Sequence, residues 1–192
     1  MARQAGPPGD SPAPAGTEAS AAHPLDTLVQ EHRAILEVLE AVEKESTAFA
    51  ENRPLRMDVL RNAIDHCDDF EERLHHRKEE ALFRALEEAG LDPVAGPTAV
   101  LRAEHAKNAR WRDRLRKAME ANDRLRMQAA ISGFIDEQRQ HILKENQIVF
   151  PLARKLLSED AFRALRRAFA SADAGYASEQ GTSGPAVTSR AL

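Results

Sequence analysis

The sequence predicts an all-α protein: an antiparallel up-down-up-down four-helix bundle followed by a short fifth helix. The chain of 192 residues has only 5% aromatic residues and is rich in Ala, Leu, Glu and Arg, a composition that favours helices. Apolar residues recur at helical spacing through four long segments, and no segment of useful length alternates as a strand would. Short breaks join the segments, so consecutive helices are expected to pack antiparallel.

The first two helices are bounded by proline and glycine. The first is expected over residues 24–51, where Pro24 suits the opening turn. The second is expected over residues 55–89, and Gly90 is a good stop signal. The following segment, residues 91–97, contains two prolines and cannot continue a helix.

The third and fourth helices are separated by one polar break. The third is expected over residues 98–120, after which Asn122 and Asp123 end one helix and cap the next. The fourth is expected over residues 124–156. Pro151 lies inside that range, and we expect it to kink or end the helix.

One domain is expected between two disordered tails. Residues 1–22 contain Pro, Gly, Ala and Ser with almost no large apolar side chains, so they cannot bury enough surface to offset chain entropy. Residues 172–192 have the same character. The bundle is therefore assigned to residues 23–171, and its short fifth helix to about residues 158–170, opened by a Ser-Glu-Asp cap.

Charge and composition exclude several classes of partner. The net charge of −4 gives no electrostatic case for nucleic acid, and the basic residues within 110–117 spread around an outer helical face. The single cysteine excludes an internal disulfide framework and fits a reducing compartment. No apolar run approaches the roughly 20 residues of a membrane span, and no apolar stretch follows the N-terminus as a signal would require. We expect a cytoplasmic protein without a nucleic-acid or membrane partner.

Two segments repeat one pattern of polar residues on an apolar helical face. His75 precedes Glu79 by four residues, and His141 precedes Glu145 by the same interval. Four residues make about one helical turn, so each His and Glu share a face. An imidazole and a carboxylate in a core are costly unless a partner satisfies them, and a bound metal ion satisfies both. The pattern predicts a metal site inside the bundle.

Each of the four long helices contributes at least one metal-competent side chain to this site. At a rise of about 1.5 Å per residue, these side chains fall in one slab of an antiparallel bundle. Nitrogen and oxygen donors without thiolate suit iron, manganese or zinc, and glutamates on opposite helices can bridge two ions. The six predicted members are His32, His75, Glu79, His105, His141 and Glu145.

At these positions the chain resembles the hemerythrin family in its bacterial HHE cation-binding branch, over about residues 24–170. The stretches that carry the resemblance are Leu28–Leu36, His75–Glu80 with Leu82-Phe83, Glu104-His105 with Arg110, and His141–Glu145 with Val149-Phe150-Pro151. The resemblance implies a non-haem di-iron centre with bridging carboxylates, which binds or senses dioxygen, nitric oxide or iron. Carried over by position, it implies the same six ligands; manganese and zinc are less favoured than iron.

The sequence departs from the family pattern at three places. The second helix is one residue short after its Glu pair, so His76 and Glu80 are an alternative ligand pair. We prefer His75 and Glu79 because the apolar residues that follow then match those of the fourth helix, Leu82, Phe83 and Leu86 against Ile148, Val149 and Leu152. Oxygen carriers of the family have five His ligands; the candidates for the fifth position here are His66, the unused member of the pair, or a water molecule. Asn108 also stands where the family often has glycine.

The pattern leaves three functions open. The first and favoured one is a binding module for a small ligand such as dioxygen or nitric oxide. The alternative is an enzyme, a di-iron oxidase or peroxidase or a repair enzyme of nitric-oxide stress, for which Gln138 is the candidate proton donor beside the metals. The third is a metal-free helical interaction protein. The sequence favours binding over catalysis and does not determine the oligomeric state.

Overall fold

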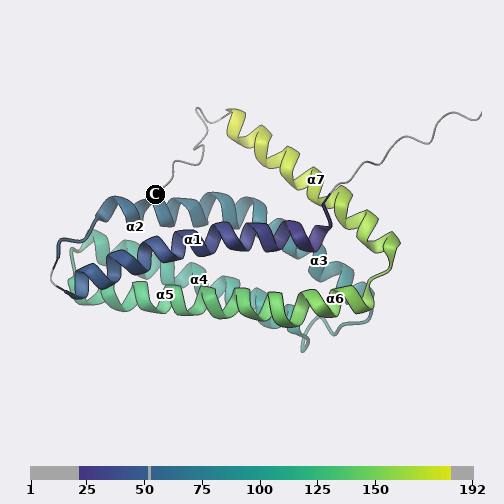
Figure 1. The fold of residues 1–192 in the computed structure, drawn as a ribbon, viewed down its shortest axis with the longest axis horizontal. Coiled ribbons are helices and arrows are strands. Elements are labelled where there is room, and N and C mark those ends of the chain that lie inside the picture. The colour runs from purple at the N-terminus through teal and green to yellow at the C-terminus, as the bar shows by residue number, and fades with distance from the viewer. Residues whose placement is uncertain (1–21, 52, 183–192) are drawn as a thin grey trace, which may run out of the picture.

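The computed structural model describes residues 22–51 and 53–182 and is all-α over these ranges, as predicted. Four long helical rods run side by side, each antiparallel to the next along the chain (Figure 1). The second and fourth rods are each helical from end to end, but each contains a π-helical segment between two α-helical segments. The rods are α1 (Pro24–Ala50); α2 (Met57–His66), η1 (Cys67–His75) and α3 (His76–Glu88); α4 (Pro97–Glu120); and α5 (Arg124–Lys144), η2 (Glu145–Val149) and α6 (Phe150–Leu156).

The predicted helix boundaries follow from local backbone chemistry. Pro24 occupies the first turn of α1, where its missing N–H costs nothing. Gly90 follows α3 with a φ of 107°, a conformation that L side chains rarely adopt. Asn122 takes a φ of 50° after α4, and the side chain of Asp123 accepts a hydrogen bond from the N–H of Arg126 at 3.1 Å, which caps α5.

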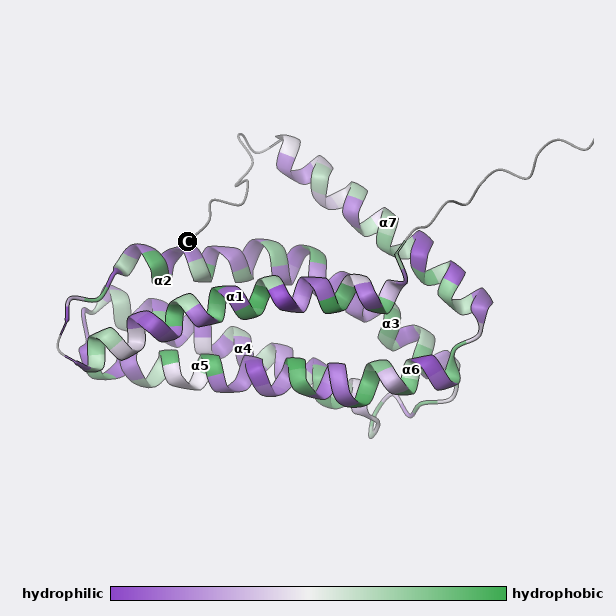
Figure 2. Ribbon diagram, in the orientation of Figure 1, coloured by the Kyte–Doolittle hydropathy of each residue, from purple (hydrophilic) through white to green (hydrophobic). Residues whose placement is uncertain are grey.

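The core consists of two apolar clusters that flank a polar layer. One cluster contains Leu39, Leu60, Cys67, Leu115, Ile131 and Ile135, among others. The other contains Leu28, Leu82, Leu101, Val149 and Phe150, among others. In every rod the predicted metal-binding positions lie between the residues of these clusters. Hydrophobic and hydrophilic residues are interspersed along each rod (Figure 2), as expected of helices that face a core on one side and solvent on the other.

The π-helical segment η2 changes the register of the fourth rod. Of the two outcomes expected at Pro151, an end of the helix is wrong, because Pro151 occupies the first turn of α6, directly after η2. Ile148 was expected in the core, but it is 56% exposed, while Val149 and Phe150 are buried. A π turn holds about one residue more than an α turn, so the buried positions after Glu145 move one place along the chain. The expected match of Ile148 with Leu82 is therefore wrong.

The last helix, α7 (Glu159–Thr182), is longer than the sequence predicted. Its first half packs Phe162, Leu165 and Phe169 into the second apolar cluster. Its second half makes polar contacts with η1 and α3, among them Tyr176 Oη donating to Asp69 at 2.7 Å. The prediction that disorder begins at residue 172 is wrong over residues 172–182, because these contacts hold a segment poor in apolar side chains.

The structure bears in different ways on the predicted tails, on membrane spans and on the single cysteine. The predicted tails at 1–21 and 183–192 lie outside the described residues. No described helix is long and apolar enough to cross a membrane. Cys67 is fully buried in the first apolar cluster, and burial raises the pKa of its thiol.

Candidate metal centre

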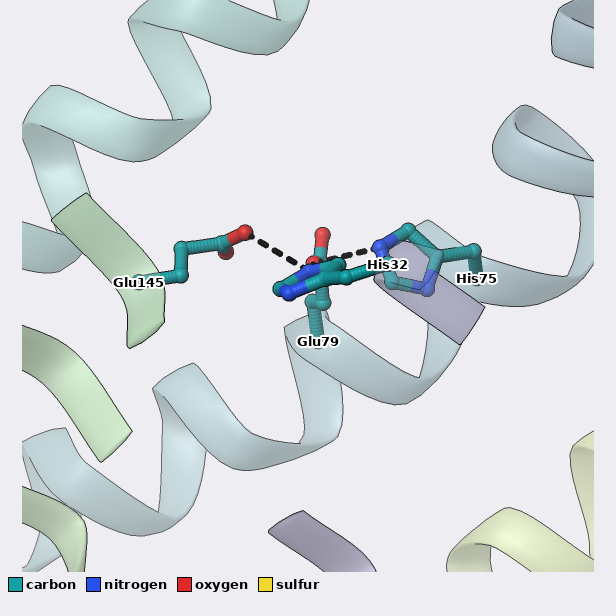
Figure 3. Close-up of side chains that lie close together, drawn as sticks. All are labelled: His32, His75, Glu79 and Glu145. Carbon is teal, nitrogen blue, oxygen red and sulfur yellow. Dashed lines mark hydrogen bonds and ion pairs between the residues drawn. The ribbon is translucent and has the colours of Figure 1, made fainter. Parts of the chain in front are cut away.

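All six predicted residues meet in the polar layer as two overlapping groups. His32, His75, Glu79 and Glu145 form the first group, which Figure 3 shows converging from the first, second and fourth rods. The second group contains Glu79, His105, His141 and Glu145. Within each group one donor atom per residue lies within 4.8 Å of the others. Two ligands on opposite sides of one ion, each about 2.1 Å from it, would be about 4.2 Å apart, so each group has the size of one coordination sphere.

Glu79 faces both groups with different oxygens. Its Oε1 lies 2.7 Å from His75 Nε2 and 3.4 Å from His32 Nε2, whereas its Oε2 lies 3.1 Å from His105 Nε2. Glu145 Oε2 lies 3.1 Å from His32 Nε2 and 3.4 Å from His141 Nε2. Each carboxylate therefore lies beside at least one imidazole of each group, as expected of a carboxylate that bridges two cations.

The donor set fits a pair of cations better than it fits a hydrogen-bond network. Glu79 Oε2 and both carboxylate oxygens of Glu145 are buried without a hydrogen-bond partner, although imidazole nitrogens lie 3.1–3.4 Å from two of these three atoms. The ring N–H groups therefore do not aim at these oxygens. Donor atoms that lie close together yet do not aim at one another are expected where lone pairs converge on a shared ion.

Buried imidazoles and carboxylates of the centre shift one another's pKa values. Burial alone would lower the pKa of His32, but the nearby carboxylates of Glu145 and Glu79 outweigh it and raise that pKa to about 9. Burial is likewise outweighed for His75, whose pKa is raised by the charge of Glu79 and a hydrogen bond to Glu31. The pKa of Glu79 lies well below its usual value despite burial, because imidazoles surround it. Ion binding at these nitrogens would displace protons, so metal binding and proton release are coupled.

Two histidines of the centre are held from behind by a carboxylate and a lysine. The Nδ1 of His75 lies 2.8 Å from Glu31 Oε2, and Lys78 donates to the other oxygen of Glu31 at 2.5 Å. A hydrogen bond at Nδ1 fixes the ring and leaves Nε2 free to face an ion. We name this set the Lys78–Glu31–His75 triad.

The second half of the bundle repeats the arrangement. The Nδ1 of His141 lies 3.2 Å from Glu104 Oε2, and Lys144 donates to Glu104 Oε1. We name this set the Lys144–Glu104–His141 triad. In each half a glutamate directly precedes the histidine of one helix, and a lysine follows the histidine of the other by three residues. Sequence reasoning missed all four outer residues, although the repeated Glu-His and His-x-x-Lys-Glu patterns were the signal that could have found them.

The alternative ligand pair lies outside both groups. His76 is half-buried, its Nδ1 is 3.3 Å from Glu72, and its ring stacks on that of His105 with 3.8 Å between centroids. Glu80 forms ion pairs with Arg84 and Arg102 instead. The structure therefore brings His75 and Glu79 into the layer and leaves the alternative pair outside it.

His66 also lies outside the groups. Its ring stacks on Phe70 with 5.1 Å between centroids, and its Nε2 is buried without a hydrogen-bond partner. Asn146 instead provides the remaining contact to the first group, with Oδ1 3.0 Å from the Nδ1 of His32.

A second buried polar cluster, formed by Gln138, Glu71, Asn108 and Arg112, lies about one turn from the candidate ligands. Gln138, three residues before His141, donates to Glu71 Oε2 at 2.8 Å and accepts from Asn108. Glu71 is one turn before His75 and is buried. Among the described residues, Glu71 Oε1, Asn108 Oδ1 and Arg112 Nη1 are buried without a hydrogen-bond partner. One donor and two acceptors left open in the same region suit a bound water.

Comparison with known proteins agrees with this geometry. Residues 23–153 match the family described as the hemerythrin HHE cation binding domain. Neither the curated proteins nor the solved structures gave a match. The match covers more than half of the chain and includes all six residues of the two groups. The chain therefore belongs to the hemerythrin HHE cation-binding domain family.

Proposed function

We propose that this protein holds two iron ions in the polar layer and binds or senses a small ligand there, namely dioxygen, nitric oxide or iron itself. The assigned ligands are His32, His75, Glu79, His105, His141 and Glu145. The observation that carries the proposal is the sharing of Glu79 and Glu145 between two groups of donor atoms. Two carboxylates that bridge two cations would neutralise part of the metal charge inside an otherwise apolar core.

The donor chemistry supports iron over the other candidates. Four imidazoles and two carboxylates without thiolate suit iron, manganese or zinc. Each group has two imidazoles and two shared carboxylates, fewer donors than the six of an octahedral ion, so open positions for an exogenous ligand remain. Iron would supply reversible redox and ligand-binding chemistry, which zinc does not offer.

The protein contributes geometry and a dry setting. His32, His75 and His141 are buried, whereas the side chain of His105 is 16% exposed. The apolar clusters on both sides exclude bulk water from the layer. A small neutral molecule can enter such a setting at less cost than a charged one.

Anaerobic iron reconstitution tests the proposal. We expect close to two equivalents of iron per chain and an optical band that appears with dioxygen or nitric oxide and reverses when the gas is removed. The measurements are elemental analysis and absorption spectroscopy. Less than about one equivalent of any transition metal after reconstitution would contradict the proposal.

The second buried polar cluster, which contains Glu71 and Gln138, supports a second candidate function: an oxidase, peroxidase or nitric-oxide repair enzyme. Such chemistry needs a proton source near the ions, and Glu71 is an ionisable side chain about one turn from His75. Gln138, the residue that the sequence suggested, has an amide that does not titrate, and it links Glu71 to Asn108. Rapid irreversible oxidation with turnover would favour this candidate over reversible binding.

A further inference from the structure

Helix α7 connects to the candidate metal centre through one of the two triads. Asp173 Oδ1 lies 2.6 Å from Lys78 Nζ, and Lys78 donates to Glu31. Glu31 in turn contacts the Nδ1 of His75. The chain of contacts passes from α7 to α3, from α3 to α1, and from α1 to η1. Each step joins charged or hydrogen-bonding groups directly.

Lys78, in the middle of this connection, is buried and therefore depends on its carboxylate partners on both sides. The side chain of Lys78 is only 3% exposed, so its ammonium depends on the carboxylates of Glu31 and Asp173. Helix α7 contacts it a second time, because Lys78 Nζ lies 5.8 Å from the ring centroid of Phe169. A shift of α7 would therefore change the pairing of Lys78 and, through it, the position of Glu31.

The other triad provides an internal comparison. Lys144 pairs with Glu104 but is 38% exposed, and no described residue of α7 forms an ion pair with it. The two halves of the bundle are thus alike next to the histidines and differ in their outer contact. Moreover, α7 lies outside the family match at residues 23–153, so of this connection only the Asp173 end lies beyond the matched region.

We propose that Asp173 is a positioning residue for His75, and that ion binding beside His75 tightens the docking of the second half of α7 onto η1 and α3. The inference rests on the proposed ligand role of His75. A hydrogen bond behind a metal-bound imidazole fixes its ring and strengthens it as a donor. Coupling is reciprocal: if α7 favours the ion, the ion favours docked α7 by the same factor.

Hydrogen exchange of α7 tests one direction of the coupling. The variants are E31Q and its matched control E104Q, which change equivalent glutamates of the two triads. With metal at saturation, we expect metal to slow exchange over residues 173–182 in the wild-type protein and in E104Q, and to have no such effect in E31Q. Equal metal-dependent slowing in both variants would show that α7 responds to general stabilisation, and the inference would be wrong.

Metal affinity tests the other direction. D173N removes the contact to Lys78, and its matched control E179Q removes a different α7 contact, the ion pairs with Arg73 and Arg77. We expect D173N to weaken one of the two ions about threefold, less than the roughly 10–100-fold typical of a direct outer partner, and E179Q to leave both affinities unchanged. Equal affinities in D173N and wild type would overturn the inference alone. A wild-type chain that takes up no ion would overturn the proposed function as well.

Discussion

The Nε2 atoms of His105 and His141 lie 3.0 Å apart, although one residue belongs to α4 and the other to α5. Two imidazole nitrogens at this distance can share a proton or can bind the same cation. Both residues belong to the group that includes Glu79 and Glu145, whose oxygens complete a set of four donors.

Removal of His141 should affect one ion more than the other. In H141A we expect the iron content to fall from about two equivalents to one or fewer, because one of two groups loses an imidazole. In E145A we expect both ions to be lost, because its carboxylate belongs to both groups. Elemental analysis after reconstitution measures both outcomes. Full metal content in both variants would show that the ligand assignment is wrong.

The neighbouring residues of the second rod provide matched controls for the ligand pair. E79Q should lose metal, whereas E80Q should retain it, because Glu80 pairs with Arg84 and Arg102 on the surface. In the same way, H75A should lose metal and H76A should keep it. Circular dichroism confirms that each variant folds. Metal loss in E80Q and H76A, with retention in the other two, would favour the alternative pair.

Bound metal should stabilise the bundle. An ion that binds only the folded chain, at a free concentration about one hundred times its Kd, adds about 2.7 kcal/mol to the free energy of unfolding. We expect a chelator to lower the Tm of the wild-type protein by several degrees and to leave the Tm of E145A unchanged. Differential scanning calorimetry measures both shifts. A chelator effect of equal size in E145A would point to an ion bound elsewhere.

The C-terminal half of α7 should come loose at high pH. Burial and the hydrogen bond to Asp69 raise the pKa of Tyr176 from 10 to about 12. Because the folded pKa is the higher one, the contribution of this contact is complete below pH 10 and is lost as the pH rises through about 12. Tyr176 is the single tyrosine, so absorbance at about 295 nm reports its titration alone.

The same titration has a matched variant. In D69N the carboxylate that accepts from Tyr176 is gone, so the midpoint should move back toward 10. A wild-type midpoint near 10 would show that the contact between α7 and η1 does not form in solution.

Close packing of α4 on α5 depends on a glycine. A Cβ at Gly133 would lie 2.6 Å from two atoms of the Trp111 ring. In G133A we expect a net loss of about 1 kcal/mol in the free energy of unfolding, because overpacking costs about 1–3 kcal/mol and alanine regains about 1 kcal/mol of helix propensity. Denaturant unfolding followed by the fluorescence of the single tryptophan measures the loss. An unchanged midpoint would mean that the ring moves aside freely.

Helical periodicity was sufficient to predict which polar residues face inward. His32, His105 and His141 share the phase of the apolar residues around them, and a regular helix carries that phase without long-range information. The caps at Gly90 and Asp123 are also local, since they depend on the preferences of one or two residues. The bundle and the six members of its polar layer followed from these signals.

Other features depend on contacts between residues distant in the sequence. The π turn at η2 exposes Ile148 in place of Val149, and periodicity alone assumes a constant turn. Helix α7 continues past residue 170 because Asp69, Arg73 and Lys78 lie beside it, more than ninety positions earlier in the chain. The triads behind His75 and His141 likewise join helices that meet only after folding. Local preference fixes the phase of each rod, whereas the partners of its polar side chains are set when the rods pack.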